Sequence, residues 1–334
     1  MPFASHEAAA IANAESFRFQ CVPAFHELPH LWGFNSAEVI KPKQEVLDVI
    51  LPQFDQAFTA EIEEFVSKQN FDTDDSGTLF NTCRAIEGEF LDLLAGVQRY
   101  RGKKLFAVGP LHPTSFESDG GHECLKWLDK QPRGSVVYVS FGSTSTLSDE
   151  QIKQLAIGLK SSGQRFMWVL RDADRGDIFA DDNSENQQRK LPAGFEEEIQ
   201  DMGMIVRGWA PQLEILAHPS TGAFVSHCGW NSCMESLSMG VPVIAWPMHS
   251  DQPRNAVMVT HYLKVGITVG DWARHEEVVQ AGEIEEVIKR MMVDEEGKEI
   301  KKRAKLLGEE ARLAVSEGGT SHEDLNSFIA HICR

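Results

Sequence analysis

The sequence lacks a cysteine framework. Its 334 residues include only six cysteines. None forms a Cys-x-x-Cys pair or stands with histidines at the spacing of a zinc site. We therefore expect reduced thiols and no cysteine-based metal site. The six are Cys21, Cys83, Cys124, Cys228, Cys233 and Cys333.

Long hydrophobic runs are also missing. The longest, such as residues 241–246, fall far short of the roughly 20 residues that a membrane-spanning helix needs. The first twenty residues contain Glu7, Glu15 and Arg18, which do not fit the apolar segment of a secretory signal. These absences predict a cytoplasmic protein with no membrane partner.

Positive charge is in deficit. The chain has 32 Lys and Arg against 50 Asp and Glu, a formal net charge of −18. Nucleic-acid binding needs clustered Lys and Arg to neutralise phosphates, so we expect no nucleic-acid partner. No feature indicates an obligate protein partner either. An anionic small molecule would have to be bound by helix N-termini and backbone amides.

The second half of the chain has a regular pattern. From Ser135 onward, short β-rich apolar runs alternate with amphipathic helical segments, which is typical of βαβ units in a parallel sheet. A helix is expected from Asp149, and helices from Glu283 to the end with a break at Gly318 and Gly319. The expected strands are residues 135–141, 166–170, 204–206, 223–226 and 241–246, and the acidic stretch 172–190 is expected to be a loop.

The first half is less regular. Residues 45–66 are expected to be helical, and residues 79–82 and 106–110 to be strands, while Pro110, Pro113, Gly120 and Gly121 indicate a linker. The length favours two domains. We expect a partial N-terminal acceptor-side domain at 1–115, a linker at 116–132, a nucleotide-binding Rossmann-like domain at 133–315, and a C-terminal helix at 316–334 packing on the first domain.

One block, residues 209–252, contains groups suited to the two ends of a nucleotide sugar. Trp209 offers a flat face for a base. At the other end of the block, Asp251 and Gln252 offer acceptors and donors for sugar hydroxyls.

Between these ends lies a phosphate site. The strand at 223–226 leads into His227 and Gly229, and a helix is expected to start at about Asn231. Gly229 allows close backbone approach, and free amides of the first turn, with the Asn231 and Ser232 side chains, can donate to a diphosphate. Glu235, one turn later, is an acceptor suited to ribose hydroxyls.

The whole block resembles the plant secondary product glycosyltransferase box, the donor signature of family 1 UDP-glycosyltransferases. The segments LFNTC, VGPLHP, CLKWLDKQP, YVSFGSTSTLSDEQ, RDADRGDIF and SFIAHI extend the resemblance along the chain and look most like the zeatin O-glucosyltransferase subgroup. The resemblance implies a GT-B fold of two Rossmann-like domains and inverting transfer of glucose from UDP-glucose to a hydroxyl of a small lipophilic acceptor, either a cytokinin such as zeatin or a flavonoid or phenolic.

The resemblance also assigns site residues. Trp209 would stack on uracil, and a terminal Gln such as Gln252 is associated with glucose donors. The other implied contacts are uridine by Ala210 and Gln212, ribose by Glu235, pyrophosphate by Ser143, His227, Asn231 and Ser232, and the sugar by Trp230, Asp251 and Gln252.

The family's catalytic pair has no match. In the family, an N-terminal-domain His deprotonates the acceptor and an Asp orients that His. The opening AAAIANAESFRF resembles the segment just after that Asp, which implies an incomplete N-terminal domain. We therefore assign no catalytic residue, expect the chain to be catalytically deficient, and keep open a UDP-sugar-binding protein without catalysis.

Other interpretations have less support. A hydride-transfer enzyme would require Gly-x-Gly-x-x-Gly after a strand, and no strand has it. Asp172 and Asp174 could form a metal site, but they lie among other acidic residues in the expected polar loop and the family resemblance implies no metal. The lone histidines His6, His26 and His30 are expected to be surface or core residues.

Overall fold

A computed structural model describes residues 11, 13–28, 75–97, 100–114, 121–142, 147–170 and 191–334. The chain divides into two compact units. The first comprises Met1–Pro113, His249–Val257 and Glu309–Arg334, and the second Thr114–Met248 and Met258–Gly308. No helix within the described ranges is both long and apolar enough to cross a bilayer.

The second unit contains a six-stranded, entirely parallel sheet in the order β6-β5-β4-β7-β8-β9. The sheet has two halves of three strands, β4-β5-β6 and β7-β8-β9, which extend in opposite directions from the central β4–β7 pair. This is the arrangement of dinucleotide-binding sheets. The strands are β4 (Val136–Ser140), β5 (Arg165–Val169), β6 (Gly203–Val206), β7 (Thr221–Ser226), β8 (Val243–Ala245) and β9 (Gly266–Thr268).

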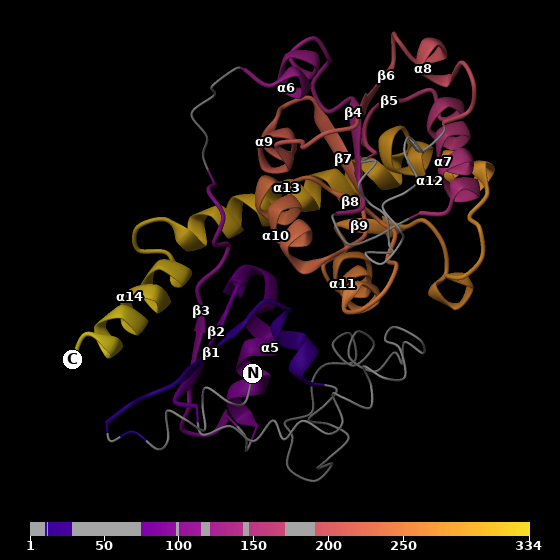
Figure 1. Ribbon diagram of the computed structural model, residues 1–334. Helices are drawn as coiled ribbons and strands as arrows, with labels where there is room; N and C mark the ends of the chain where they lie inside the picture. The colour runs from indigo at the N-terminus through magenta and orange to yellow at the C-terminus, as the bar shows by residue number, and fades with distance from the viewer. Residues whose placement is uncertain are drawn as a thin grey trace, which may run out of the picture. The chain divides into compact units, whose positions relative to one another are not determined.

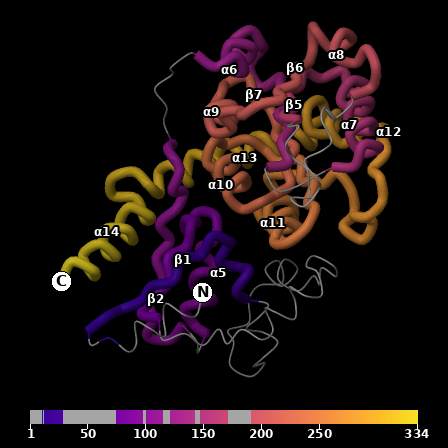
Figure 2. Tube along the Cα trace, in the orientation of Figure 1, coloured from indigo at the N-terminus to yellow at the C-terminus, as the bar shows by residue number. Residues whose placement is uncertain are grey.

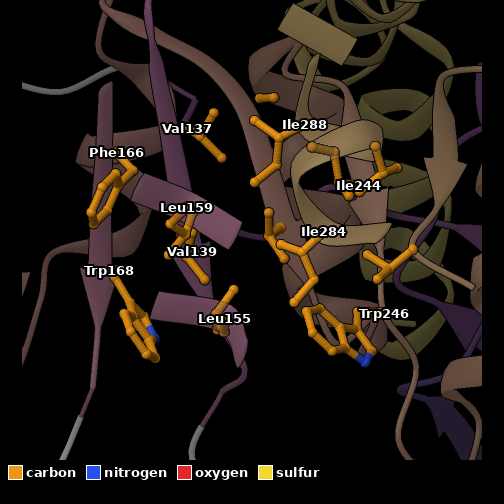
Figure 3. Packing of buried hydrophobic residues seen from close by; sticks show 14 of the residues in the cluster. Val137, Val139, Leu155, Leu159, Phe166, Trp168, Ile244, Trp246, Ile284 and Ile288 are labelled. Carbon is orange, nitrogen blue, oxygen red and sulfur yellow. The ribbon is translucent and has the colours of Figure 1, made fainter. Parts of the chain in front are cut away.

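Side-chain alternation on the strands separates two cores, one on each face of the sheet. On β4, Val137 and Val139 belong to one core and Val136 and Tyr138 to the other. The first core (Figure 3) includes residues of α7 (Asp149–Ser161) and α12 (Ala281–Met292), and the second includes residues of α6 (Glu123–Leu128) and α9 (Gln212–Ala217). This unit is therefore a three-layer α/β/α sandwich, whose layers can be followed in Figure 1.

Local sequence explains how α7 is placed against its neighbour. The Ser148 side chain caps its N-terminus by accepting from the Gln151 backbone N–H at 3.2 Å. At Gly158 an added Cβ would lie 2.7 Å from Cβ of Ile284 on α12. Glycine at this position therefore allows α7 and α12 to pack closely over the sheet.

The remaining elements of this unit are α8 (Phe195–Glu198), α10 (Trp230–Met239), the π-helix η3 (Met258–Tyr262), η4 (Trp272–Arg274) and α13 (Glu295–Val315), whose last residues belong to the first unit.

The first unit contains a parallel three-stranded sheet, β1-β2-β3. Its C-terminal helix α14 contacts β3 and is drawn in yellow beside the strands in Figure 2. Phe328 of α14 packs on the rings of Phe17 and Phe106, with centroids 5.1 Å and 5.5 Å away. The elements of this unit are β1 (Phe17–Gln20), η1 (Ala24–His26), β2 (Gly77–Phe80), α5 (Arg84–Gly96), β3 (Lys104–Ala107), α11 (Gln252–Val257) and α14 (Thr320–Ile332).

Two carboxylates of this unit bind backbone amides. Asp324 of α14 accepts from the Ala107 N–H at 2.8 Å. Glu87, fully buried in α5, accepts from the Ala24 and Phe25 N–H groups at 3.0 Å each. Burial raises the pKa of Glu87 to about 7, although the backbone bonds lower it. Asp324 and Glu87 therefore fix the end of β3 and the η1 segment.

Most expected strands and helices are confirmed, with ends shifted by a few residues. The strands β1 and β9 and the helices α5, α6 and α8 were not predicted from the sequence. The first two are short, three or four residues long, and alternate weakly, while α6 lies in the segment expected as linker. All six cysteines are free thiols. The expected helix at 45–66, the loop at 172–190 with Asp172 and Asp174, and His6 and His30 lie outside the described residues.

Candidate functional site

The candidate site lies where the strand order of the second unit reverses. β4 and β7 are parallel neighbours, with Ser140 opposite Ser226, and the chain continues from them to opposite sides of the sheet. In open α/β sheets, the crevice at the carboxyl ends of such a strand pair is where ligands bind. The residues following β4 and β7 are therefore the expected ligand contacts.

A tight turn follows β7 and leads into α10. Cys228 adopts a left-handed conformation, with φ of 65°. The turn is held by the Ser226 hydroxyl, which accepts from the Cys228 N–H at 3.1 Å. Gly229 then serves as the N-cap of α10. This turn places His227 at the carboxyl edge of the sheet, directly before the helix.

The His227 ring is closely packed between two glycines. A Cβ added to Gly142, which follows β4, would lie 2.8 Å from ring atoms of His227, and one added to Gly229 would lie 2.5 Å from Nε2. These distances are shorter than any normal van der Waals contact. Only glycine at both positions leaves room for the imidazole in this orientation.

The N-terminus of α10 faces the same turn. Gly229 provides no side-chain cap for the helix, and the first-turn amides and the helix dipole favour an anion. In this turn Trp230 and Ser232 are buried, while Asn231 is exposed. The turn can therefore offer backbone and side-chain donors to a phosphate group.

A hydrogen-bonded network joins α9 to α10 beside this turn. The Gln212 amide donates from Nε2 to Glu235 Oε2 at 2.6 Å and to Ser232 Oγ at 3.0 Å. Its Oε1 accepts from the Tyr138 hydroxyl of β4 at 3.3 Å. Gln212, Ser232 and Glu235 are thus brought together although they come from two helices.

The pKa of Glu235 is raised, chiefly because burial disfavours the charged carboxylate; the hydrogen bond from Gln212 opposes this shift. A partly desolvated carboxylate gains more than an exposed one from hydroxyl donors that approach it. Glu235 is therefore suited to accept hydrogen bonds from a diol such as ribose.

Trp209 lies at the entrance to α9 and is largely exposed, with 71% of its surface accessible. The ring of His122, the N-cap of α6, packs edge-on against it with centroids 5.9 Å apart. Ala210, the next residue, is partly buried against the adjacent core. An exposed, laterally supported indole is a natural stacking surface for a base.

Asp251 and Gln252 belong to the first unit. The Asp251 carboxylate accepts from Asn255 Nδ2 at 2.7 Å, and burial raises its pKa. Gln252 is the first residue of α11 and is buried, with Oε1 accepting from the His249 N–H at 3.1 Å. Both polar side chains are held in defined orientations.

Comparisons with known proteins identify the family of the chain. Residues 109–300 match the family described as UDP-glucoronosyl and UDP-glucosyl transferase, and residues 1–113 match the family described as glycosyltransferase, N-terminal domain. The chain belongs to the plant family 1 UDP-glycosyltransferases. Zeatin O-glucosyltransferase of Phaseolus lunatus is 46% identical over 342 residues, covering 100% of this chain and 72% of the relative. Zeatin O-xylosyltransferase of Phaseolus vulgaris is 46% identical over 340 residues, covering 100% of this chain and 73% of the relative.

Solved structures identify the same GT-B fold. A transferase from Siraitia grosvenorii in complex with UDP superimposes with a TM-score of 0.79 at 32% identity, covering 98% of this glycosyltransferase and 76% of the other chain. Phytolacca americana UGT2, complexed with UDP-2fluoro-glucose and pterostilbene, has a TM-score of 0.75 at 32% identity, covering 99% and 75%. The expectation of a UDP-glycosyltransferase with a GT-B fold is confirmed.

The glycosyltransferase brings several of the predicted site residues together in its second unit: Gln212, His227, Gly229, Ser232 and Glu235, with Trp230 and Asn231 in the same turn of α10. Ser143 lies outside the described residues. In the described part of the chain, no group of three or more His, Cys, Asp or Glu side chains could bind a metal ion.

Three residues that contact the site were not among the predicted site residues: Gly142, His122 and Tyr138. Gly142 follows a strand and has a positive φ of 74°, so its position in a strand-to-loop turn could have indicated it. His122 and Tyr138 are distant in sequence from the residues they contact, and the pattern of their own segments contains no signal of this.

Proposed function

We propose that this glycosyltransferase binds UDP-glucose and transfers glucose, with inversion, to a hydroxyl of a small lipophilic acceptor. The observation that supports this most directly is the half-buried Gln212–Glu235 pair beside the helix N-terminus at the β4–β7 switch point. A ribose acceptor next to a diphosphate site is what a nucleoside diphosphate requires.

In this proposal each end of the donor has its own residues. Uracil stacks on Trp209 and meets the Ala210 backbone, and Gln212 and Glu235 hold the uridine and its ribose. The pyrophosphate lies at the α10 N-terminus, bound by His227 and the side chains of Asn231 and Ser232, with Ser143 as a further contact. Trp230, Asp251 and Gln252 bind the sugar. No metal is needed, because helix amides and His227 supply the positive potential.

The choice of sugar is open to a direct test. A glucosyltransferase and a xylosyltransferase are equally identical to this chain, at 46% each, so overall similarity does not decide between them. We propose glucose because the donor block ends in Gln252, and a Gln at this position is associated with glucose donors in the family; its amide can both donate to and accept from sugar hydroxyls. Glucose differs from xylose by one hydroxymethyl group, so a pocket built for it should lose affinity for UDP-xylose.

The acceptor follows from the relatives. Two of them are named for zeatin, and we propose a cytokinin of this kind, with a flavonoid or phenolic as the alternative. No residue of the chain has been matched to the family's deprotonating His or its Asp. We therefore expect transfer by the purified 334-residue chain to be slow, since general-base catalysis typically contributes about 100- to 10,000-fold.

Calorimetry tests donor binding separately from transfer. The chain should bind UDP in EDTA, and UDP-glucose more tightly than UDP-xylose. The matched variant is His227→Ala. It should weaken UDP binding by about 1 to 3 kcal/mol because its contact with phosphate is lost. Binding only after manganese is added, or equal affinity for both sugar nucleotides, would contradict the respective part of the proposal.

Product analysis then distinguishes transfer from binding alone. Incubation with UDP-glucose and zeatin, followed by mass spectrometry and anomeric coupling by NMR, should detect a slowly formed β-glucoside. Donor binding with no detectable product would favour the alternative function, a UDP-sugar-binding protein without catalysis.

A further inference from the structure

Tyr138 is a core residue whose hydroxyl reaches a residue of the candidate site. It lies in the middle of β4 and is fully buried, with its ring stacked on Phe224 of β7 at a centroid distance of 5.1 Å and 23° between the planes. Both residues belong to the core on the α6 and α9 face. Strand and ring packing therefore fix the hydroxyl at the point where it meets Gln212.

The Gln212 carboxamide has chemically different neighbours at its two ends. Glu235, when ionised, can only accept hydrogen bonds, and it faces the Nε2 end at 2.6 Å. The opposite end of the amide then presents Oε1, which needs a donor, and Tyr138 supplies it. The reversed amide would put Oε1 against the carboxylate, where the two acceptors repel each other.

We propose that Tyr138 is a positioning residue of the donor site, which fixes the Gln212 amide so that Gln212 holds the Glu235 carboxylate ready for the two ribose hydroxyls. This rests on the proposed function, in which Glu235 receives the ribose. With phenylalanine at this position, ring packing remains but Oε1 loses its donor. The amide then rotates more freely, and Glu235 is no longer held in one orientation before the ligand arrives.

The test uses a ligand that lacks the groups concerned. Tyr138→Phe is compared with the wild type by calorimetry, using UDP and 2′,3′-dideoxy-UDP. We expect UDP to bind about three- to tenfold more weakly to the variant, the size of one net hydrogen bond. Dideoxy-UDP makes no hydroxyl contact with Glu235 and should therefore lose clearly less affinity than UDP in the variant. Its retained binding also verifies that the variant is folded.

A matched control comes from the other unit. Tyr100 is also buried, and its hydroxyl donates to Glu27 at 2.7 Å. Tyr100→Phe removes a hydroxyl of the same kind that bonds Glu27 rather than Gln212, and it should leave UDP affinity unchanged. In a Gln212→Ala background, Tyr138→Phe should have no further effect on UDP, because the positioned group is gone.

Three results would overturn the inference: equal weakening of both ligands in Tyr138→Phe, no weakening of UDP, or additive effects of the Tyr138 and Gln212 substitutions. In each of these cases the wild type still binds UDP, so the proposed function stands. Failure of the wild type to bind UDP would overturn both.

Discussion

Gly229→Ala gives a sharp test of how His227 is held. Gly229 has φ of −58° and ψ of 139°, which alanine adopts without strain. The substitution therefore acts through space alone, where the new Cβ would lie 2.5 Å from Nε2 of the imidazole. A normal contact is about 3.5 Å or more, so the ring must move by about 1 Å or rotate.

Movement on that scale breaks a hydrogen bond between His227 and phosphate. We expect UDP affinity to fall by about 1 to 3 kcal/mol, or about 5- to 150-fold. Gly229→Ala should thus approach His227→Ala, and the double variant should be no weaker than the weaker single variant. Calorimetry with UDP measures all three.

Gly270→Ala is the matched control, because an added Cβ there meets nothing within 4 Å. It should bind UDP like the wild type. The reasoning is refuted if Gly229→Ala binds UDP within a factor of two of the wild type while His227→Ala binds far more weakly.

Because the pKa of Glu87 rises from 4.5 to about 7 on folding, this group alone should lower the free energy of unfolding by about 3 kcal/mol as pH rises from 4.5 to 7. Glu87→Gln should remove this contribution in urea titrations and leave a smaller decrease; an unchanged slope would contradict it. Trp209→Ala should weaken UDP binding by about 1 to 3 kcal/mol in calorimetry, because the base loses its stacking partner. Unchanged UDP affinity would exclude stacking. Asp324→Ala should lower unfolding free energy by about 1 to 3 kcal/mol by leaving the Ala107 N–H without its acceptor, whereas exposed Glu317→Ala should not.

The fold was predictable where burial is complete. The strands β4, β7 and β8 are buried on both faces, so their sequences are nearly continuous apolar runs that stand out from the chain. β1 includes an exposed and three half-buried residues, and β9 is three residues long. Such strands are defined by pairing with neighbours, which no local pattern records.

The part of the candidate site whose residues are close together in the sequence was predictable. The block from Trp209 to Glu235 contains the turn, the helix start and both members of the Gln212–Glu235 pair. Contacts that depend on strand register were not predictable: Gly142 meets His227 only because β4 and β7 end together. Tyr138 reaches Gln212 because alternation along β4 turns it toward α9.

The bond between Asp324 and Ala107 has a consequence for behaviour in concentrated solution. β3 is an end strand of its sheet as far as the chain is described, and the Ala107 N–H points away from β2. An outward amide on an end strand is a template for pairing with another chain. The C-terminal helix covers this amide with a carboxylate and the neighbouring Phe17 and Phe106 with Phe328. Deleting α14 would therefore expose an unpaired strand edge, and the shortened protein should aggregate.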